Sequence, residues 1–181
     1  STHGFAILGG NLTTITDCRA VCCTSNGGYM PSTSPSFHTF NNFYAVSNNT
    51  NGIVSNGSVT VNNSTLSNNG YGFACSYQSN QVYNLTAKDN SNYGVLSQLG
   101  SVQIIGLTTS GNATAGVYTT SQGVAFLDNT ACTDTTPFNA NIGSIYISRL
   151  GGDPAVSRIY ADNSGTAIVA QIATTPVHGT S

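Results

Sequence analysis

The sequence predicts an all-β protein built as a parallel β-helix, and two observations lead to this prediction. The first is an internal repeat, in which an asparagine is followed four residues later by a glycine and then by an apolar residue. It occurs four times, at Asn48/Gly52/Ile53, Asn68/Gly72/Phe73, Asn90/Gly94/Val95 and Asn112/Gly116/Val117. The second is a shortage of charge, since the 181 residues include only four basic and six acidic side chains. Surface helices rely on Glu, Lys and Arg, so little material for helices is present.

The repeat period indicates the architecture. The repeated glycines are 20, 22 and 22 residues apart, a spacing that is too short for a propeller blade and fits one coil of a parallel β-helix. The residue directly after each glycine is apolar, and the residue three places after it is always small: Ser55, Cys75, Ser97 and Thr119. Because side chains alternate between the two faces of a strand, both positions fill one narrow interior. We expect three short strands in each coil.

The repeated asparagines and glycines are predicted to be structural. Asparagines in successive coils would lie about 4.8 Å apart, close enough for their amides to hydrogen-bond to one another. The glycine four residues on is expected to supply a positive φ where the chain leaves the turn. We therefore expect a scaffold ladder rather than a ligand site. It would consist of Asn48, Asn68, Asn90 and Asn112 with Gly52, Gly72, Gly94 and Gly116.

The repeat divides the chain into three predicted parts. About six coils of 20–24 residues, starting at Gly4, Gly28, Gly52, Gly72, Gly94 and Gly116, make a parallel β-helix over residues 1–127. Residues 128–141 are predicted to be a connector. Three strand-like runs separated by turn sequences follow in residues 142–181, and they predict a short antiparallel β module that caps the helix and supports oligomerisation. The first residues lack a basic or apolar leader, so we expect a fragment of a longer chain.

An apolar column appears where a polar one is expected. The residue two places after each glycine should point outward, yet this column reads Ala6, Val54, Ala74, Leu96 and Tyr118. A strand that is apolar on both faces is covered on both faces. The column predicts the interface of a parallel homotrimer, and the alternative is cover by another part of the same chain.

Composition also limits the partners. Four basic residues cannot neutralise a run of phosphates, so no nucleic acid is expected. No apolar stretch is long enough for membrane insertion. The five cysteines are odd in number and lack zinc-ligand spacing, which favours free buried thiols and assembly in a reducing cytoplasm. His3, His38 and His178 share no metal-ligand spacing, and we expect no metal and no cofactor.

These features together resemble a known group of proteins. The Asn-Gly-apolar register, the scarcity of charge, the change of pattern after Leu127 and the apolar outer column are similar to the right-handed β-helix proteins of bacteriophage tailspikes and tail fibres. The resemblance covers about residues 4–127 and is specific for the fold, since pectate lyases, polygalacturonases and bacterial adhesins share the coil. It implies a homotrimeric virion component that contacts a host surface glycan and sometimes cleaves it.

Catalytic residues are not evident in this fragment. Glycoside hydrolysis needs two carboxyl groups about 5 to 9.5 Å apart. The candidates are Asp17, Asp89, Asp128, Asp134, Asp153 and Asp162, and the coil alignment stacks no pair of them. Motifs typical of polygalacturonases and alginate epimerases are absent, so we expect no enzymatic activity within the fragment itself. A pair of carboxylates completed upstream or by a neighbouring subunit stays open.

Tyrosines are the candidate glycan-binding residues. Sugars dock on aromatic rings bordered by amides and hydroxyls, and the chain has nine tyrosines and no tryptophan. The candidates are Tyr71, Tyr77, Tyr83, Tyr93 and Tyr118. The alternative interpretation is that these rings stack between coils or pack at the subunit interface.

The leading functional hypothesis is a structural, receptor-binding segment of a phage-like tail fibre or tailspike that contacts host cell-surface polysaccharide. Such a protein would be located in the virion after assembly in the host cytoplasm. One alternative is the C-terminal part of a polysaccharide-degrading β-helix enzyme whose catalytic carboxylates lie outside the fragment or between subunits. A further alternative is a bacterial surface adhesin, which would be extracellular.

Overall fold

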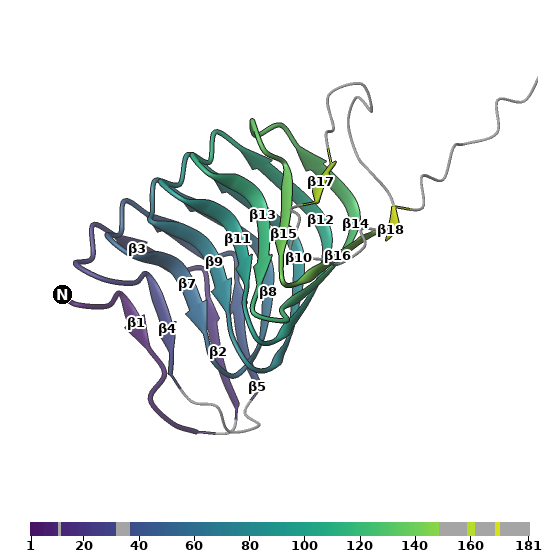
Figure 1. Ribbon diagram of the computed structural model, residues 1–181. Coiled ribbons are helices and arrows are strands. Elements are labelled where there is room, and N and C mark those ends of the chain that lie inside the picture. Colours follow the sequence, from purple (N-terminus) through teal and green to yellow (C-terminus); the bar gives the residue numbers. More distant parts are fainter. Residues whose placement is uncertain (11, 32–36, 149–158, 162–168, 171–181) are drawn as a thin grey trace, which may run out of the picture.

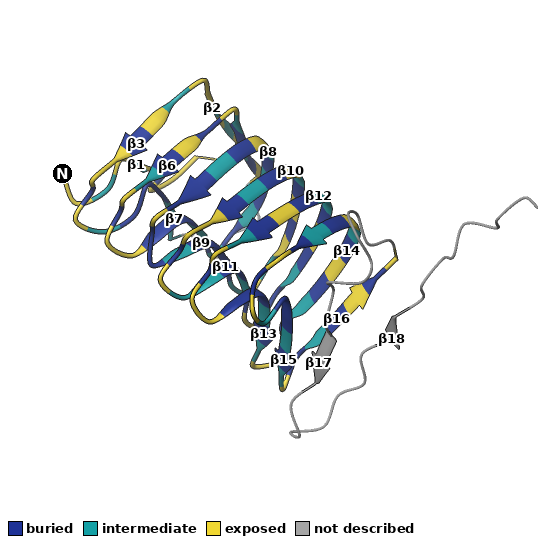
Figure 2. Ribbon diagram, turned by 90° about the horizontal axis from the view of Figure 1, so that it is seen from above, coloured by how far each residue is buried: buried dark blue, intermediate teal, exposed yellow. Residues whose placement is uncertain are grey.

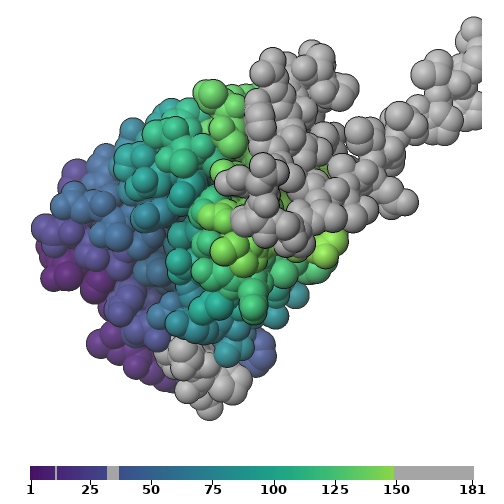
Figure 3. Space-filling view, in the orientation of Figure 1, coloured from purple at the N-terminus to yellow at the C-terminus, as the bar shows by residue number. Residues whose placement is uncertain are grey.

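The computed structural model describes residues 1–10, 12–31, 37–148, 159–161 and 169–170. Every regular element assigned in this part of the chain is a β-strand, and the strands stack into a parallel solenoid of about six turns (Figure 1). The predicted all-β class and parallel β-helix are thus confirmed. Successive coils follow one another from the N-terminal end in sequence order, which the space-filling view shows as consecutive colour bands (Figure 3).

Two parallel sheets form the walls of the solenoid. Sheet A contains β1 (Phe5–Ala6), β4 (Gly28–Met30), β7 (Asn51–Ser55), β9 (Tyr71–Cys75), β11 (Tyr93–Ser97), β13 (Ala115–Thr120), β15 (Phe138–Asn141) and β17 (Ile159–Ala161). Sheet B contains β2 (Leu12–Thr16), β5 (Phe37–Asn41), β8 (Ser58–Ser67), β10 (Ser79–Lys88), β12 (Ser101–Ser110), β14 (Val124–Cys132), β16 (Ser144–Ile147) and β18 (Val169–Ala170), joined by β3 (Arg19–Val21) and β6 (Tyr44–Val46).

The core contains the two inward columns that the repeat predicts. Ile53, Phe73 and Val95 are paired in register in adjacent strands of sheet A, and each is fully buried. The small column of Ser55, Cys75, Ser97 and Thr119 is buried beside them. Burial alternates along the long strands of sheet B, such as β10 and β14, whereas the short strands of sheet A, such as β7 and β9, are buried at most positions (Figure 2). The predicted inward faces of sheet A are therefore correct.

Sheet B has fewer strands than predicted, because its strands bend instead of breaking. From β8 onward, the two strands expected in each coil are one long strand with a left-handed residue in its middle, such as Asn63 (φ 48) or Asn84 (φ 54). Asparagine tolerates this conformation, and the Asn84 side-chain amide also donates to Asn63 Oδ1 at 3.0 Å. Each later coil therefore has two strands rather than three.

The asparagine ladder exists, but one of its predicted members is wrong. Asn69, not Asn68, stacks between Asn48 and Asn90. Asn68 is exposed and takes a left-handed backbone conformation (φ 54), like Ser47 in the preceding coil (φ 56). The turn before Gly72 is one residue shorter than the others, so counting back from the glycine selects the wrong asparagine. The same offset applies to sheet B, where Leu66 is in register with the buried Ala87.

Each rung of the ladder satisfies the backbone of its neighbour. Asn69 Oδ1 accepts the backbone N–H of Asn48 at 3.0 Å and the Asn48 side-chain amide at 2.9 Å. The Asn69 amide donates in turn to the backbone carbonyl of Ala45 at 3.1 Å. Buried polar groups are costly unless they are hydrogen-bonded, so the ladder lets the turns enter the interior. It begins at the backbone N–H of Cys23 and ends at Asp134.

The repeated glycines have a different role from the predicted one. None of Gly52, Gly72, Gly94 and Gly116 has a positive φ. A Cβ added at Gly72 would clash with the carbonyl oxygen of Gly94 and would lie 3.2 Å from the ladder amide of Asn90. Glycine is required here because neighbouring backbones approach too closely for a side chain. A Cβ added at Gly27 would likewise meet the carbonyl oxygen of Gly52 and the ladder amide of Asn48. Gly27, rather than Gly28, therefore occupies the glycine position one coil before Gly52.

The solenoid continues beyond residue 127, where the repeat was expected to stop. β14 extends to Cys132, and β15 lies within the predicted connector 128–141, paired in parallel with β13. β17 and β18 also pair in parallel, with β15 and β16. The turns predicted for an antiparallel module in 142–181 fall at 151–154 and 162–165, outside the described residues. The predicted domain division otherwise stays a prediction.

The ladder assignment predicts unequal effects of two neighbouring substitutions. Asn69→Ala should lower the free energy of unfolding by about 3 kcal/mol, because it leaves the buried Asn48 backbone and side-chain donors without an acceptor. Asn68→Gly should change it by less than about 0.5 kcal/mol, because glycine accepts the left-handed conformation at this exposed position. Urea denaturation followed by circular dichroism measures both values. Equal losses, or a larger loss for Asn68→Gly, would contradict the assignment.

Candidate functional site

The outward face of sheet B changes its chemistry along the solenoid. Its central outward column is aligned by the strand register and reads Thr14, Thr39, Thr60, Gln81, Gln103, Phe126 and Tyr146. Hydroxyl groups thus give way to amides and then to aromatic rings. The face is rigid, because every second side chain of the same strands is packed into the core. Its aromatic end is the strongest candidate for a binding site.

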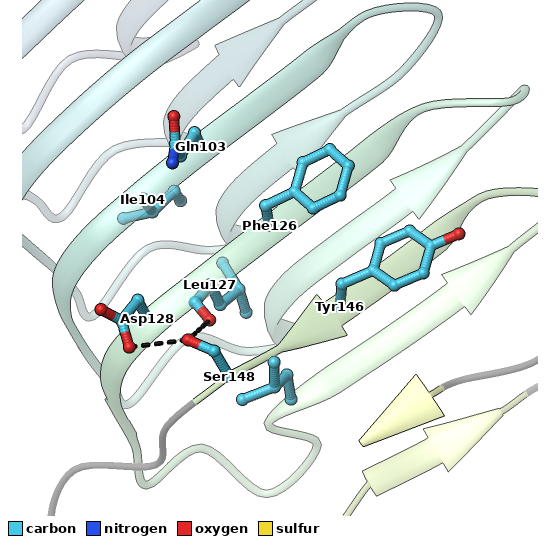
Figure 4. Close-up of a pocket in the computed structure, with 8 residues that line it drawn as sticks. Gln103, Ile104, Phe126, Leu127, Asp128, Tyr146 and Ser148 are labelled. Atoms are coloured by element: carbon cyan, nitrogen blue, oxygen red, sulfur yellow. Dashed lines mark hydrogen bonds between the residues drawn. The ribbon is translucent and has the colours of Figure 1, made fainter. Parts of the chain in front are cut away.

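A hollow of about 360 Å³ lies at this aromatic end, on strands β12, β14 and β16. The rings of Phe126 and Tyr146 are stacked 5.0 Å apart and are 46% and 39% exposed, so both present apolar surface to solvent. Figure 4 shows them over neighbouring strands, with Gln103 beyond Phe126. Exposed aromatic rings next to an amide are typical of surfaces that bind sugars.

Polar groups border the hollow on its other side. The Ser148 hydroxyl group lies 2.7 Å from Asp128 Oδ1 and 3.3 Å from the backbone carbonyl of Leu127 (Figure 4). These contacts fix the Asp128 carboxylate at the rim of the hollow. The hollow therefore combines an apolar floor with hydrogen-bonding groups that can take sugar hydroxyls.

The structure brings together three of the five predicted glycan-binding tyrosines. Tyr93 stacks on Tyr118 with ring centroids 4.4 Å apart and on Tyr71 at 5.6 Å. Tyr93 thus has a ring on each side, and all three rings of this row are half-buried, whereas Phe126 and Tyr146 are stacked on each other but remain exposed. The row fits the alternative interpretation of rings stacked between coils. Burial and the neighbouring hydroxyl groups of Tyr118 and Tyr71 raise the pKa of Tyr93 above its ordinary value.

The remaining two tyrosines lie apart from this row. Tyr83 is on the outer face of sheet B, in the same column as Asp128 and two coils before it, and its hydroxyl group donates to Gln81 Oε1 at 3.4 Å. Tyr83 therefore shares a face with the hollow. Tyr77 is 56% exposed in the turn between β9 and β10, away from both sets of rings.

Phe126, Tyr146 and Gln103 are candidates that sequence reasoning missed. The predicted repeat ends at Leu127, so it does not align Tyr146 with Phe126. A signal was present, because each aromatic residue stands directly before a buried aliphatic residue, Leu127 or Ile147, and these two lie 20 residues apart. Extending the period by one coil would have found the pair.

The predicted interface column lies on the outer face of sheet A. The register aligns Ala6, Val54, Ala74, Leu96 and Tyr118, and it adds Tyr29 between the first two. Ala6 is exposed, Ala74 is buried, and the other three predicted residues are half-buried. A continuous apolar row thus runs along this face.

The four described candidate carboxylates do not form a pair. Asp17 lies at the bend of sheet B beside Asn42, Asp89 lies in a turn, and Asp134 is buried at the end of the ladder. With Asp128, each occupies a different column, whereas glycoside hydrolysis needs two opposed carboxyl groups. Asp153 and Asp162 lie outside the described residues. Within the described ranges, no group of three or more His, Cys, Asp or Glu side chains could hold a metal ion.

Other reactive side chains are mostly inactivated by burial. All five cysteines are free, and burial raises the pKa of the Cys75 and Cys132 thiols to about 12. His38 is buried on the inward face of sheet B, and this burial lowers the pKa of its imidazole.

Across the residues that the structure covers, no helix has the length and apolar character to cross a membrane. Among the features described, the hollow on sheet B therefore remains the strongest candidate for a binding site.

Comparison with known proteins adds no further assignment. No protein-family model, no curated protein and no solved structure matches the chain. The parallel β-solenoid is established by the strand register, and a function has to be argued from the exposed faces.

Proposed function

We propose that this chain is a noncatalytic, glycan-binding structural segment of a phage-like tail fibre or tailspike, and that its ligand is a polysaccharide of the host cell surface. The observation that carries the proposal is the hollow with the stacked, exposed rings of Phe126 and Tyr146. These rings offer the flat apolar surface on which pyranose rings pack. Gln103 and Ser148 supply hydrogen-bonding groups at its border.

The scaffold supports this function by holding the hollow in place. Phe126 is flanked along β14 by the buried residues Ala125 and Leu127, so the strand cannot turn without losing core packing. A preorganised surface loses little conformational entropy when a flexible chain such as a polysaccharide binds. The separation of the described carboxylates favours binding over cleavage.

We further propose that the outer column of sheet A is the contact between three copies of the chain. Val54, Leu96 and Tyr118 form a half-buried apolar row that runs along the solenoid axis. Packing of parallel solenoids through the same face would cover this row in every copy. The hollow of sheet B would stay accessible, because it lies on the other sheet.

Substitution of the aromatic pair tests the binding proposal. In a binding screen against bacterial capsular and O-antigen polysaccharides, Phe126→Ala and Tyr146→Ala should each weaken binding about tenfold, equal to about 1.4 kcal/mol. Tyr77→Ala is the matched control, since this exposed ring lies away from the hollow. Unchanged binding in both variants would contradict the proposed site. New reducing ends or an unsaturated-uronate absorbance during incubation would instead support the alternative that the chain belongs to a polysaccharide-degrading enzyme.

The oligomeric state tests the second proposal. Multi-angle light scattering should give the mass of three chains for the wild type. Leu96→Asp should release monomers, because it places a charge in the apolar row, which would be desolvated in the interface. Thr60→Asp, on the outer face of sheet B, should leave the assembly intact. A monomeric wild-type protein would contradict the proposal.

A further inference from the structure

Four asparagines of the chain are directly followed by glycine. This dipeptide is the one most prone to spontaneous deamidation, because a glycine has no Cβ to hinder the approach of its backbone nitrogen to the asparagine side chain. The four sites are Asn26-Gly27, Asn51-Gly52, Asn56-Gly57 and Asn69-Gly70. The structure separates them into two classes.

Deamidation needs freedom of the asparagine side chain. The backbone nitrogen of the glycine attacks the side-chain carbonyl carbon of the asparagine, loses its proton and forms a cyclic succinimide, while the amide leaves as ammonia. Water then opens the ring at either carbonyl and leaves aspartate or isoaspartate. No oxidant or enzyme takes part. Hydrogen bonds that hold the side-chain amide in another orientation therefore slow the first step.

Three of the four asparagines are held in this way. Asn69 is 2% exposed, and its side chain makes the ladder bonds to Asn48, to the Ala45 carbonyl and to Asn90. Asn51 is 7% exposed and donates to Asn26 Oδ1 at 2.7 Å. Asn26 is 5% exposed, and its amide nitrogen lies 3.3 Å from His3 Nδ1.

Asn56 differs from these three in exposure and in bonding. It lies in the turn between β7 and β8, and its side chain is half-buried. The bond found for its side chain within the described residues is a 3.5 Å contact from Nδ2 to the backbone carbonyl of Pro31, at the upper limit for a hydrogen bond. Gly57 does not have a positive φ, so its conformation does not require glycine.

We infer that Asn56 is a deamidation site of the native protein and that the side-chain amide bonds protect the other three Asn-Gly sequences. The reaction places a new carboxylate two residues before Ser58, where β8 begins. The folded structure thus determines which of the four Asn-Gly sequences deamidates. In an unfolded chain, the same reaction at Asn69 would remove the ladder amide that donates to Ala45 and Asn90.

Peptide mapping by mass spectrometry tests the inference. After incubation of the native protein in alkaline buffer, Asn56 should be deamidated at least about tenfold faster than Asn26, Asn51 and Asn69, a barrier difference of about 1.4 kcal/mol. In urea, which unfolds the chain, the deamidation rates of the four asparagines should become similar. Equal native rates at Asn56 and Asn69 would overturn the inference, and so would a difference that persists in urea.

Two variants separate intrinsic reactivity from protection. Gly57→Ala should slow the native reaction at Asn56, because its Cβ hinders the approach of the attacking nitrogen. Asn90→Ala removes the oxygen that accepts from the Asn69 backbone and side chain, so it should speed the reaction at Asn69 while Asn56 is unchanged. If Asn90→Ala unfolds the chain, the wild-type comparison of native and urea rates still decides. No increase at Asn69 in a folded Asn90→Ala variant would contradict protection by the ladder.

Discussion

The structure depends on the buried side-chain amide ladder that joins one coil to the next. In the rungs from Asn48 to Asn112, one amide oxygen accepts both a backbone N–H and a side-chain N–H from the preceding coil, as Asn112 does for Asn90 at 3.1 and 2.8 Å, and the Asp134 carboxylate does the same for Asn112. The turns can therefore cross the interior without unsatisfied donors. A coil that lost this bond would leave buried donors without an acceptor, at a cost of about 1–3 kcal/mol each.

The same regular stacking determines what the outer faces can do. Equivalent residues of adjacent coils lie one strand spacing apart, so rings repeated along a face cover one another. Tyr93 stacks in this way on Tyr71 in the preceding coil and on Tyr118, which reaches it from another column of the next coil. Ring surface becomes available where a column ends or changes its chemistry. Phe126 and Tyr146 occupy such a place, after a run of threonines and glutamines. A binding function on this scaffold is thus expected where the repeat is broken.

The sequence predicted the coil and its interior, because periodic burial leaves a periodic pattern. It predicted Asn68 in place of Asn69, because a turn that is one residue shorter is invisible when residues are counted from the glycine. It also assigned the glycines a positive φ, whereas their actual cause, the approach of the next backbone, depends on three-dimensional packing. The candidate site at Phe126 was missed since the coil after Leu127 contains Pro137 and resembles a connector. This coil is held in place by the pairing of β15 with β13, a contact between strands of different coils that the local sequence does not reveal.

The most direct test of the ladder is hydrogen exchange of the asparagine side-chain amides, followed by NMR spectroscopy. The Nδ2 protons of Asn48, Asn69, Asn90 and Asn112 are expected to exchange only when the coils open, because each amide is buried and hydrogen-bonded. The Nδ2 protons of the exposed Asn68 should exchange at the rate of a free amide. Protection of Asn68 together with fast exchange of Asn69 would contradict the account.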